Sequence, residues 1–185
     1  MSALDGFYST WNKARETFGA GTPDDGSQFD GSTRLRQMKA GVEAAAPDAR
    51  WQGTASEAYA AANKKHADIY EKLADLDQKM AAEIKNAANI VTAGRESLDR
   101  TRDWVSSLAA SVPNSEAGKK MLLAIISKGM GDISEVIESS TVGMTESKGR
   151  IEALKAGYDE LKTQQFAPAG GDENGKKDTQ MLGDQ

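Results

Sequence analysis

A hydrophobic pattern of unusual length runs through the middle of the chain. Its positions alternate in steps of three and four residues, which is the spacing of one face of a helix in a coiled coil. The pattern comprises Tyr59, Ala62, His66, Ile69, Leu73, Leu76, Met80, Ile84, Ala87, Val91, Gly94, Leu98, Thr101, Val105, Leu108 and Val112. A helix over residues 54–112 would be about 88 Å long at 1.5 Å per residue. A compact globule of 185 residues cannot contain such a helix, so we expect an elongated molecule.

A second pattern of the same kind begins after Pro113 and Asn114, which end the first helix. It predicts a helix over about residues 115–164. Its positions are Leu122, Ile126, Gly129, Ile133, Val136, Ser140, Met144, Ser147, Ile151, Leu154, Tyr158 and Leu161. Because so short a break allows only an antiparallel arrangement, we expect an all-α helical hairpin. Poor helix formers over 138–143 leave open whether this region is kinked.

Two shorter helices are predicted before the hairpin. The first is amphipathic, and Ser2 with Asp5 forms a capping box at its start. The second has one apolar face and ends at Pro47. The expected organisation is an N-terminal helix over 1–18, a loop over 19–31, a helical bundle over 32–164 with helices at about 32–46, 54–112 and 115–164, and a disordered tail over 165–185.

A Trp-x-Gly turn lies between the second short helix and the first long helix. In Trp51-Gln52-Gly53, the glycine permits a tight turn and the tryptophan is expected to fill the hollow where two helices diverge. Thr54 and Glu57 follow with the spacing of a capping box. The sequence therefore predicts a helix-turn-helix near the N-terminus.

Composition excludes several classes of function. With 23 basic and 28 acidic residues, the net charge of −5 argues against a nucleic-acid binder. The chain has no cysteine and a single histidine, His66, which we expect on the helix interface. We therefore expect no cofactor, no metal site and no catalytic residues. No apolar run is long enough to span a membrane, and no Sec-type signal peptide is expected.

Small residues form a second stripe on the first long helix. They recur every seven residues, which favours close approach of another helix along this side. The partner of the stripe is either the helix at 32–46 or another chain. The predicted packing face consists of Ala60, Ala67, Ala74, Ala81 and Ala88, together with Tyr70 and Ile84.

The segment WQGTASEAYAAANKKHADIYEKLADLDQKMAAEI resembles the N-terminal helical domain of the EspA/EspE family, substrates of the mycobacterial ESX (type VII) secretion systems. Its architecture is shared by the wider WXG-motif superfamily. The resemblance covers about residues 1–112. The residues that carry it are Trp51, Gly53, Tyr59, Asn63, His66 and Leu73-Ala74-Asp75-Leu76-Asp77, with a weaker match at Leu4-Asp5-Gly6-Phe7-Tyr8.

The resemblance implies a helical bundle that is exported folded, with Trp51 and Gly53 as its secretion and turn motif. It also implies a small helical partner of the EspC type that carries a Tyr-x-x-x-Asp/Glu export signal, as well as type VII machinery or its chaperone. Location would be cytoplasmic before export, then secreted or at the cell surface. This chain lacks that acidic signal, because the residues four beyond its tyrosines are Asn12, Asn63, Ala74 and Lys162.

Two alternatives to secretion remain at this stage. One is a cytosolic helical adaptor or chaperone that is not exported. The other is a small helical enzyme, which the lack of an acid–base or metal constellation disfavours. Homo-oligomerisation is a further alternative to a separate partner, because a hairpin with a diluted seam buries little apolar area for its length.

Overall fold

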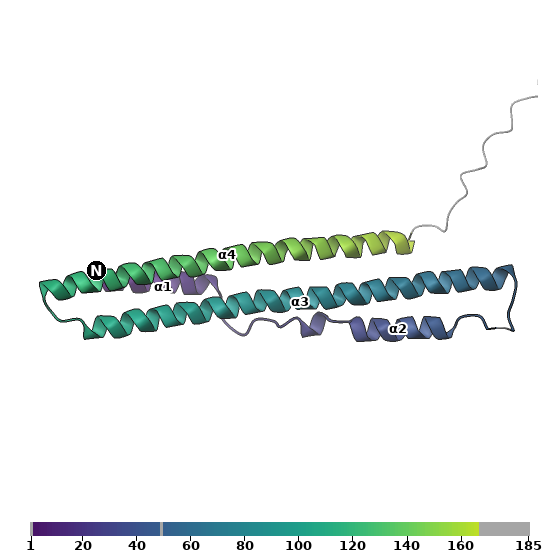
Figure 1. Ribbon diagram of the computed structural model, residues 1–185, viewed down its shortest axis with the longest axis horizontal. Helices are drawn as coiled ribbons and strands as arrows, with labels where there is room; N and C mark the ends of the chain where they lie inside the picture. Colours follow the sequence, from purple (N-terminus) through teal and green to yellow (C-terminus); the bar gives the residue numbers. More distant parts are fainter. Residues whose placement is uncertain (1, 49, 167–185) are drawn as a thin grey trace, which may run out of the picture.

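The computed structural model describes residues 2–48 and 50–166, and all regular structure in these residues is helical (Figure 1). The two longest helices lie side by side in opposite directions, which confirms the predicted all-α hairpin and its elongated shape. The elements are α1 (Ala3–Thr17), the short 3-10 helix η1 (Ser27–Phe29), α2 (Ser32–Ala44), α3 (Thr54–Ser111) and α4 (Glu116–Phe166).

Glycines set the contact between α3 and α4. A Cβ atom on Gly129 would lie 2.6 Å from Val105, one on Gly143 would lie 3.1 Å from Ile90, and one on Gly157 would lie 3.0 Å from Leu76. These three glycines are spaced fourteen residues apart on α4, and their partners on α3 follow in the reverse order. The missing side chains let the two backbones approach closely, and the reversed order fixes the antiparallel register.

This register leaves the beginning of α3 uncovered by α4. Because Gly157 lies opposite Leu76, the last residue of α4 reaches only to the level of about Ala67. His66 is exposed, so its predicted place on the helix interface is wrong. The three-four pattern of α3 includes residues that lie beyond the end of α4. A pattern on one helix carries no information about the length of the helix that packs against it.

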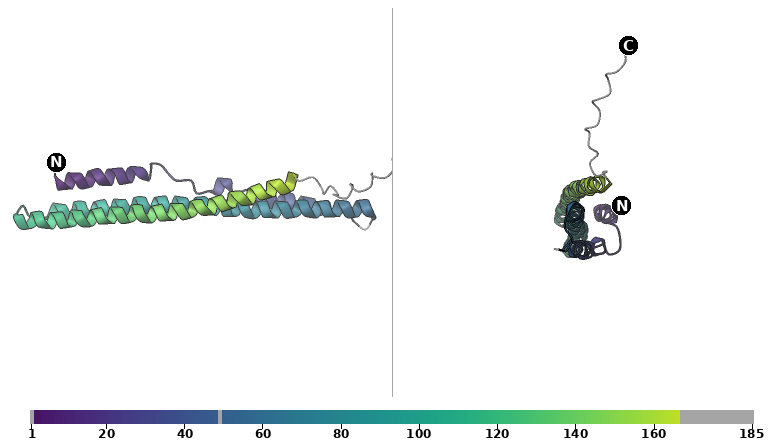
Figure 2. Two further views of the ribbon diagram at one scale, coloured as in Figure 1. Left: turned by 90° about the horizontal axis from the view of Figure 1, so that it is seen from above. Right: turned by 90° about the vertical axis from the view of Figure 1, so that its right-hand side faces the viewer.

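α1 packs along one side of the hairpin, over the half that contains the α3–α4 connection (Figure 2). Its capping box is confirmed, since the Ser2 hydroxyl accepts from the Asp5 amide and the Asp5 carboxylate accepts from the Ser2 amide. The buried side of α1 is formed by Phe7, Trp11 and Ala14. These side chains join a core cluster that also contains Leu98, Val105, Ile126 and Ile133.

α2 packs against α3 alone. In the described part of the chain it contacts neither α1 nor α4. In the half of the molecule away from the hairpin connection, α2, α3 and α4 therefore form one layer with α3 in the middle (Figure 2, right). α1 lies to one side of this layer, over the other half of the hairpin. The helices therefore form a single layer in one half of the molecule, and α1 packs onto both hairpin helices in the other half.

The boundaries of the helices agree closely with the sequence-based expectation. α4 is one continuous helix through residues 138–143. The predicted tail at 165–185 lies outside the described residues, apart from the last helical positions of α4. No helix in the described ranges is long and apolar enough to cross a membrane.

Candidate functional site

The Trp-x-Gly turn forms one tip of the molecule, between α2 and α3. Gly53 has φ +110° and ψ −176°, a conformation that residues with a Cβ atom rarely adopt. The Ser56 hydroxyl donates a hydrogen bond of 2.7 Å to the Trp51 carbonyl and fixes the turn against the first turn of α3. The glycine is thus required by the backbone geometry.

Trp51 does not fill a hollow between the helices. Its side chain is 45% exposed and lies against Tyr59, with 5.1 Å between the ring centroids and 46° between the planes. Tyr59 is itself 40% exposed. The expected packing fails because α2 ends at Ala44, several residues before the turn, so no second helix stands beside the indole. The result is an aromatic pair open to solvent at the tip.

The predicted capping box at Thr54 is also wrong. Thr54 is the first residue of α3, and Gly53 holds the N-cap position without any side-chain cap. A residue inside the helix cannot turn its hydroxyl back to the amides of the first turn. The Ser56 hydroxyl donates to the carbonyl of Trp51, which ties the turn to α3 but caps none of the backbone amides of its first turn.

The alanine stripe lies beneath α2 and η1 over most of its length. Ala67 and Ala74 are buried, Ala81 is partly buried, and Gly26 of the preceding loop sits directly on the Ala81 carbonyl. This stretch is therefore closed to a second chain, because the chain's own N-terminal part occupies it. Ala88, Tyr70 and Ile84 are partly buried, and Ala60 alone is exposed.

Charged pairs hold α2 in this place. Arg36 pairs with Asp75 at 3.0 Å, and Lys39 pairs with Glu71 at 3.4 Å. The Asn63 side-chain amide also donates to the Val42 carbonyl at 3.4 Å. The partners of these partly exposed contacts follow in opposite order along α2 and α3, so the two helices are antiparallel. The contacts fix the orientation of α2 more than they stabilise it, since exposed ion pairs are worth about 0–1 kcal/mol each.

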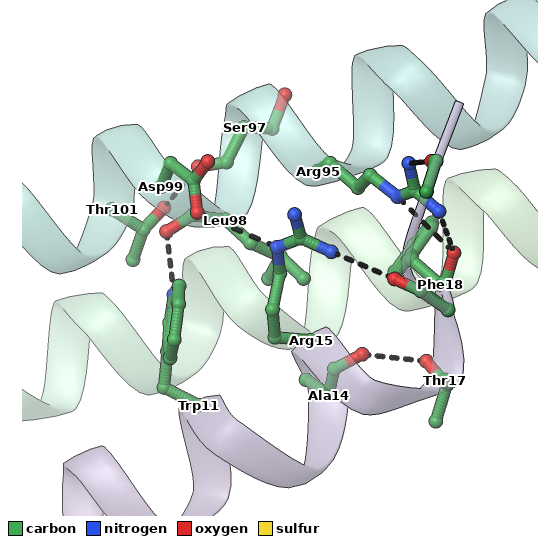
Figure 3. A network of polar contacts seen from close by, with 12 residues as sticks. Trp11, Ala14, Arg15, Thr17, Phe18, Arg95, Ser97, Leu98, Asp99 and Thr101 are labelled. Atoms are coloured by element: carbon green, nitrogen blue, oxygen red, sulfur yellow. Dashed lines mark hydrogen bonds and ion pairs between the residues drawn. The ribbon is translucent and has the colours of Figure 1, made fainter. Parts of the chain in front are cut away.

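Polar contacts hold α1 and the segment after it on α3, and the sequence pattern did not predict them (Figure 3). The Trp11 indole N–H donates to the Leu98 carbonyl at 2.6 Å, and the Arg102 guanidinium lies 4.8 Å from the indole ring. The Arg95 guanidinium donates to the Phe18 carbonyl at 2.8 Å and to the Gly21 carbonyl at 2.5 Å (Figure 3). A tryptophan and an arginine thus lock the N-terminal segment onto α3.

A signal for this contact was present in the sequence. Trp11 lies on the apolar face of a capped amphipathic helix, and such a face must be buried somewhere. In the structure, the contact with α3 includes Gly94, where a Cβ atom would collide with the Phe18 ring. Helix amphipathicity tells that a face is buried but not against what, so the partner could not be read from α1 alone.

The titratable groups of the described residues form ion pairs and one polar cluster around Asp77. Over residues 2–48 and 50–166, no three His, Asp or Glu side chains gather closely enough to hold a metal ion. The Tyr158 hydroxyl of α4 donates to the Asp77 carboxylate of α3, and the Gly31 amide donates to the other oxygen of Asp77 at 3.2 Å. Burial and this carboxylate raise the pKa of Tyr158. The cluster ties three elements together.

Comparison with known proteins agrees with this architecture. Residues 18–100 match the model of the EspA/EspE family. The chain is 32% identical over 102 residues to the ESX-1 secretion-associated protein EspA of Mycobacterium tuberculosis, which covers 54% of this chain. It is 30% identical over 94 residues to the ESX-1 secretion-associated protein EspE of Mycolicibacterium smegmatis, which covers 50% of this chain. No solved structure gives a significant match.

The match is confined to part of each relative. It covers 24% of EspA and 18% of EspE. On this chain, the matched family region runs from the end of α1 through α2, the Trp51 turn and most of α3. It therefore contains the exposed tip and the alanine stripe, and it confirms the resemblance that these residues predicted. Over residues 18–100, this chain is therefore similar to the EspA/EspE family.

Proposed function

We propose that the chain is a substrate of a mycobacterial ESX (type VII) secretion system. It acts as a helical structural and interaction protein and has no catalytic role. The family match over residues 18–100, which includes the Trp51-Gln52-Gly53 turn, carries the proposal. Its relatives are named as ESX-1 secretion-associated proteins, and we take the proposed secretion system and export route from those names. The chain would be cytoplasmic before export and then secreted or held at the cell surface.

The exposed tip is the proposed site of a small helical partner. Trp51 and Tyr59 present two adjacent aromatic rings to solvent, and exposed Ala60 follows on α3. Aromatic side chains of this kind are the usual anchors of protein interfaces. The partner would supply the acidic Tyr-x-x-x-Asp/Glu signal that no tyrosine of this chain begins. The rest of the alanine face stays with α2.

Export of a tagged full chain tests the proposal. The chain would be expressed in a mycobacterial host and in the same host without its ESX system, and culture filtrate would be compared with cell lysate. The double variant Trp51→Ala with Gly53→Ala should accumulate in the lysate. Trp104→Ala is the matched control, because Trp104 is also a partly exposed tryptophan, at 37%, and lies far from the tip.

Two results would contradict the proposal. A chain that stays in the lysate of the intact host would be a cytosolic adaptor or chaperone. Normal export of the Trp51 and Gly53 double variant would remove the turn from the export mechanism. Circular dichroism of each purified variant separates loss of export from loss of fold, since the long helices lie beyond the turn.

A further inference from the structure

α4 carries a second row of apolar side chains beside the row that packs into α3, and Met144 and Ile151, which the sequence pattern placed in the seam, belong to this second row. Its members recur every seven residues, so they share one side of the helix. Ile137 and Met144 are 40% and 41% exposed, and Ile151 is partly exposed. The complete row is Met130, Ile137, Met144, Ile151 and Tyr158. Large side chains at this regular spacing form a strip on the surface.

Both ends of this row lie near residues of the N-terminal part of the chain. At one end, Met130 packs against the core cluster that contains Phe7 of α1. At the other end, the Tyr158 hydroxyl reaches Asp77, which also accepts from the amide of Gly31. The row therefore lies on the same side of the hairpin as α1, and the line of α1 continues over its uncovered middle.

The segment between α1 and α2 leaves this middle open because it is held on α3. The Arg95 side chain of α3 binds the carbonyls of Phe18 and Gly21. A few residues on, Gly26 rests on Ala81 of α3. No contact between α4 and η1 or α2 occurs in the described part of the chain. In this half of the molecule, α4 is supported only by α3.

A row of lysines runs next to the uncovered side chains. Lys148, Lys155 and Lys162 are also seven residues apart, and all three are exposed. No ion pair joins them to any residue that the structure describes, although Glu152 and Asp159 follow the first two at a distance of four residues. Within the described ranges, the three lysines form a row of unpaired positive charges beside the apolar strip.

We propose that this strip docks an amphipathic helix of another protein, with acidic residues along the edges of its apolar face. The docking strip is defined as Ile137, Met144 and Ile151 with Lys148 and Lys155. The seven-residue spacing fits a helix that lies along α4, in the way that α1 lies along the preceding part of α4. From Ile137 to Ile151 the strip is about 21 Å long, which accommodates about four turns of the incoming helix.

Charge argues against a second copy of this chain as the occupant. When two equal helices pack antiparallel about a two-fold axis, equivalent flanking positions meet on the same side. Packing the docking strip against itself about Met144 would set Lys148 and Lys155 of one copy near Thr141 and Ser134 of the other, which carry no charge to pair with them. Glutamates or aspartates on the helix of another protein would instead pair with both lysines.

This inference goes beyond the proposed function, because it concerns α4 and not the tip that carries the Trp51 turn. It is tested on the purified full chain and does not depend on export. The probe is a fluorescein-labelled designed helix of about 18 residues, with leucines along one face and glutamates at both edges of that face. A twin peptide has lysines in place of the glutamates.

Fluorescence anisotropy should show that the glutamate peptide binds the chain and the lysine peptide does not. The double variant K148E/K155E should lose at least tenfold in affinity for the glutamate peptide and gain affinity for its lysine twin. The control K72E/K79E makes the same change of charge at two exposed lysines, seven residues apart on α3, and should bind like the parent chain. Met144→Ser should weaken binding of the glutamate peptide to the parent chain and of the lysine peptide to K148E/K155E.

Three outcomes would overturn the inference. The first is equal binding of both peptides, or of neither, to the parent chain. The second is an equal loss in K72E/K79E, which would indicate a general charge effect. The third is a parent chain that light scattering shows to be a dimer and that K148E/K155E converts to a monomer, which would assign the strip to a second copy. Circular dichroism of every variant establishes that the helices are retained.

Discussion

Replacing each of two tryptophans by alanine should have unequal consequences. Trp11 is 7% exposed and lies between α1 and the hairpin, with its indole N–H bonded to the Leu98 carbonyl at 2.6 Å. Trp51 is 45% exposed and touches chiefly Tyr59. The Trp51 turn is the more conspicuous motif in the sequence, but Trp11 is the residue that the fold depends on.

The magnitude follows from the area that each side chain removes from water. A tryptophan buries about 200 Å², and at about 25 cal/mol per Å² its loss at a nearly closed site costs about 3–5 kcal/mol. The hydrogen bond to Leu98 adds about 1 kcal/mol. Trp11→Ala should therefore release α1, whereas Trp51→Ala should cost only about 2–3 kcal/mol, because nearly half of its side chain is already in solvent.

Urea unfolding followed by far-ultraviolet circular dichroism measures both values. Limited proteolysis reports on α1 separately, since a released α1 should be cleaved before the rest of the chain unfolds. Trp11→Phe is the graded control, because it keeps most of the apolar area and removes only the indole donor. The reasoning is refuted if Trp51→Ala lowers the free energy of unfolding by as much as Trp11→Ala.

Three further changes probe other contacts of the structure. Gly94→Ala should lower stability by about 1–3 kcal/mol, because its Cβ atom would collide with Phe18, whereas Gly131→Ala, in open space, should raise it by about 0.5–1 kcal/mol; thermal unfolding compares the two. Ala74→Glu puts a carboxylate under α2 and should cost about 2–4 kcal/mol, with faster proteolysis of α2; a stable variant would contradict the packing. Because the pKa of Tyr158 is raised, its stabilising contribution is complete below pH 10 and is lost as the pH rises further. Tyr158→Phe should therefore reduce the fall in urea midpoint between pH 8 and pH 11, and an unchanged fall would count against the cluster.

Local patterns were enough to predict the helices. Residues 54–112 and 115–164 were identified from the three-four spacing, and the structure places α3 at Thr54–Ser111 and α4 at Glu116–Phe166. The short break at Pro113 was enough to predict the hairpin, since it permits only one return path. These features depend on neighbours in the sequence, which is why they could be read without coordinates.

Long-range placement was harder to predict. His66 continues the seam in the sequence, yet it is exposed because α4 ends before reaching it. Trp51 has the size and setting of a buried anchor, yet α2 ends too early to cover it. For the alanine stripe, the sequence left two partners open, and only the positions of Arg36 and Lys39 beside α3 identify α2 as the cover. Each of these outcomes depends on where a distant segment stops.

The position of α1 has a consequence for the synthesis of the chain. Phe7 packs beside Gly129, and its core cluster includes Ile133, so the groove for α1 is complete only after most of the chain exists. At roughly 5–20 residues per second, the ribosome makes α1 several seconds before it makes that part of α4. We expect nascent chains arrested before residue 116 to leave α1 sensitive to protease, and protection of α1 in such chains would contradict this order. During that interval Phe7 and Trp11 form the apolar face of an unpaired helix, so α1 leaves the ribosome well before its binding groove exists.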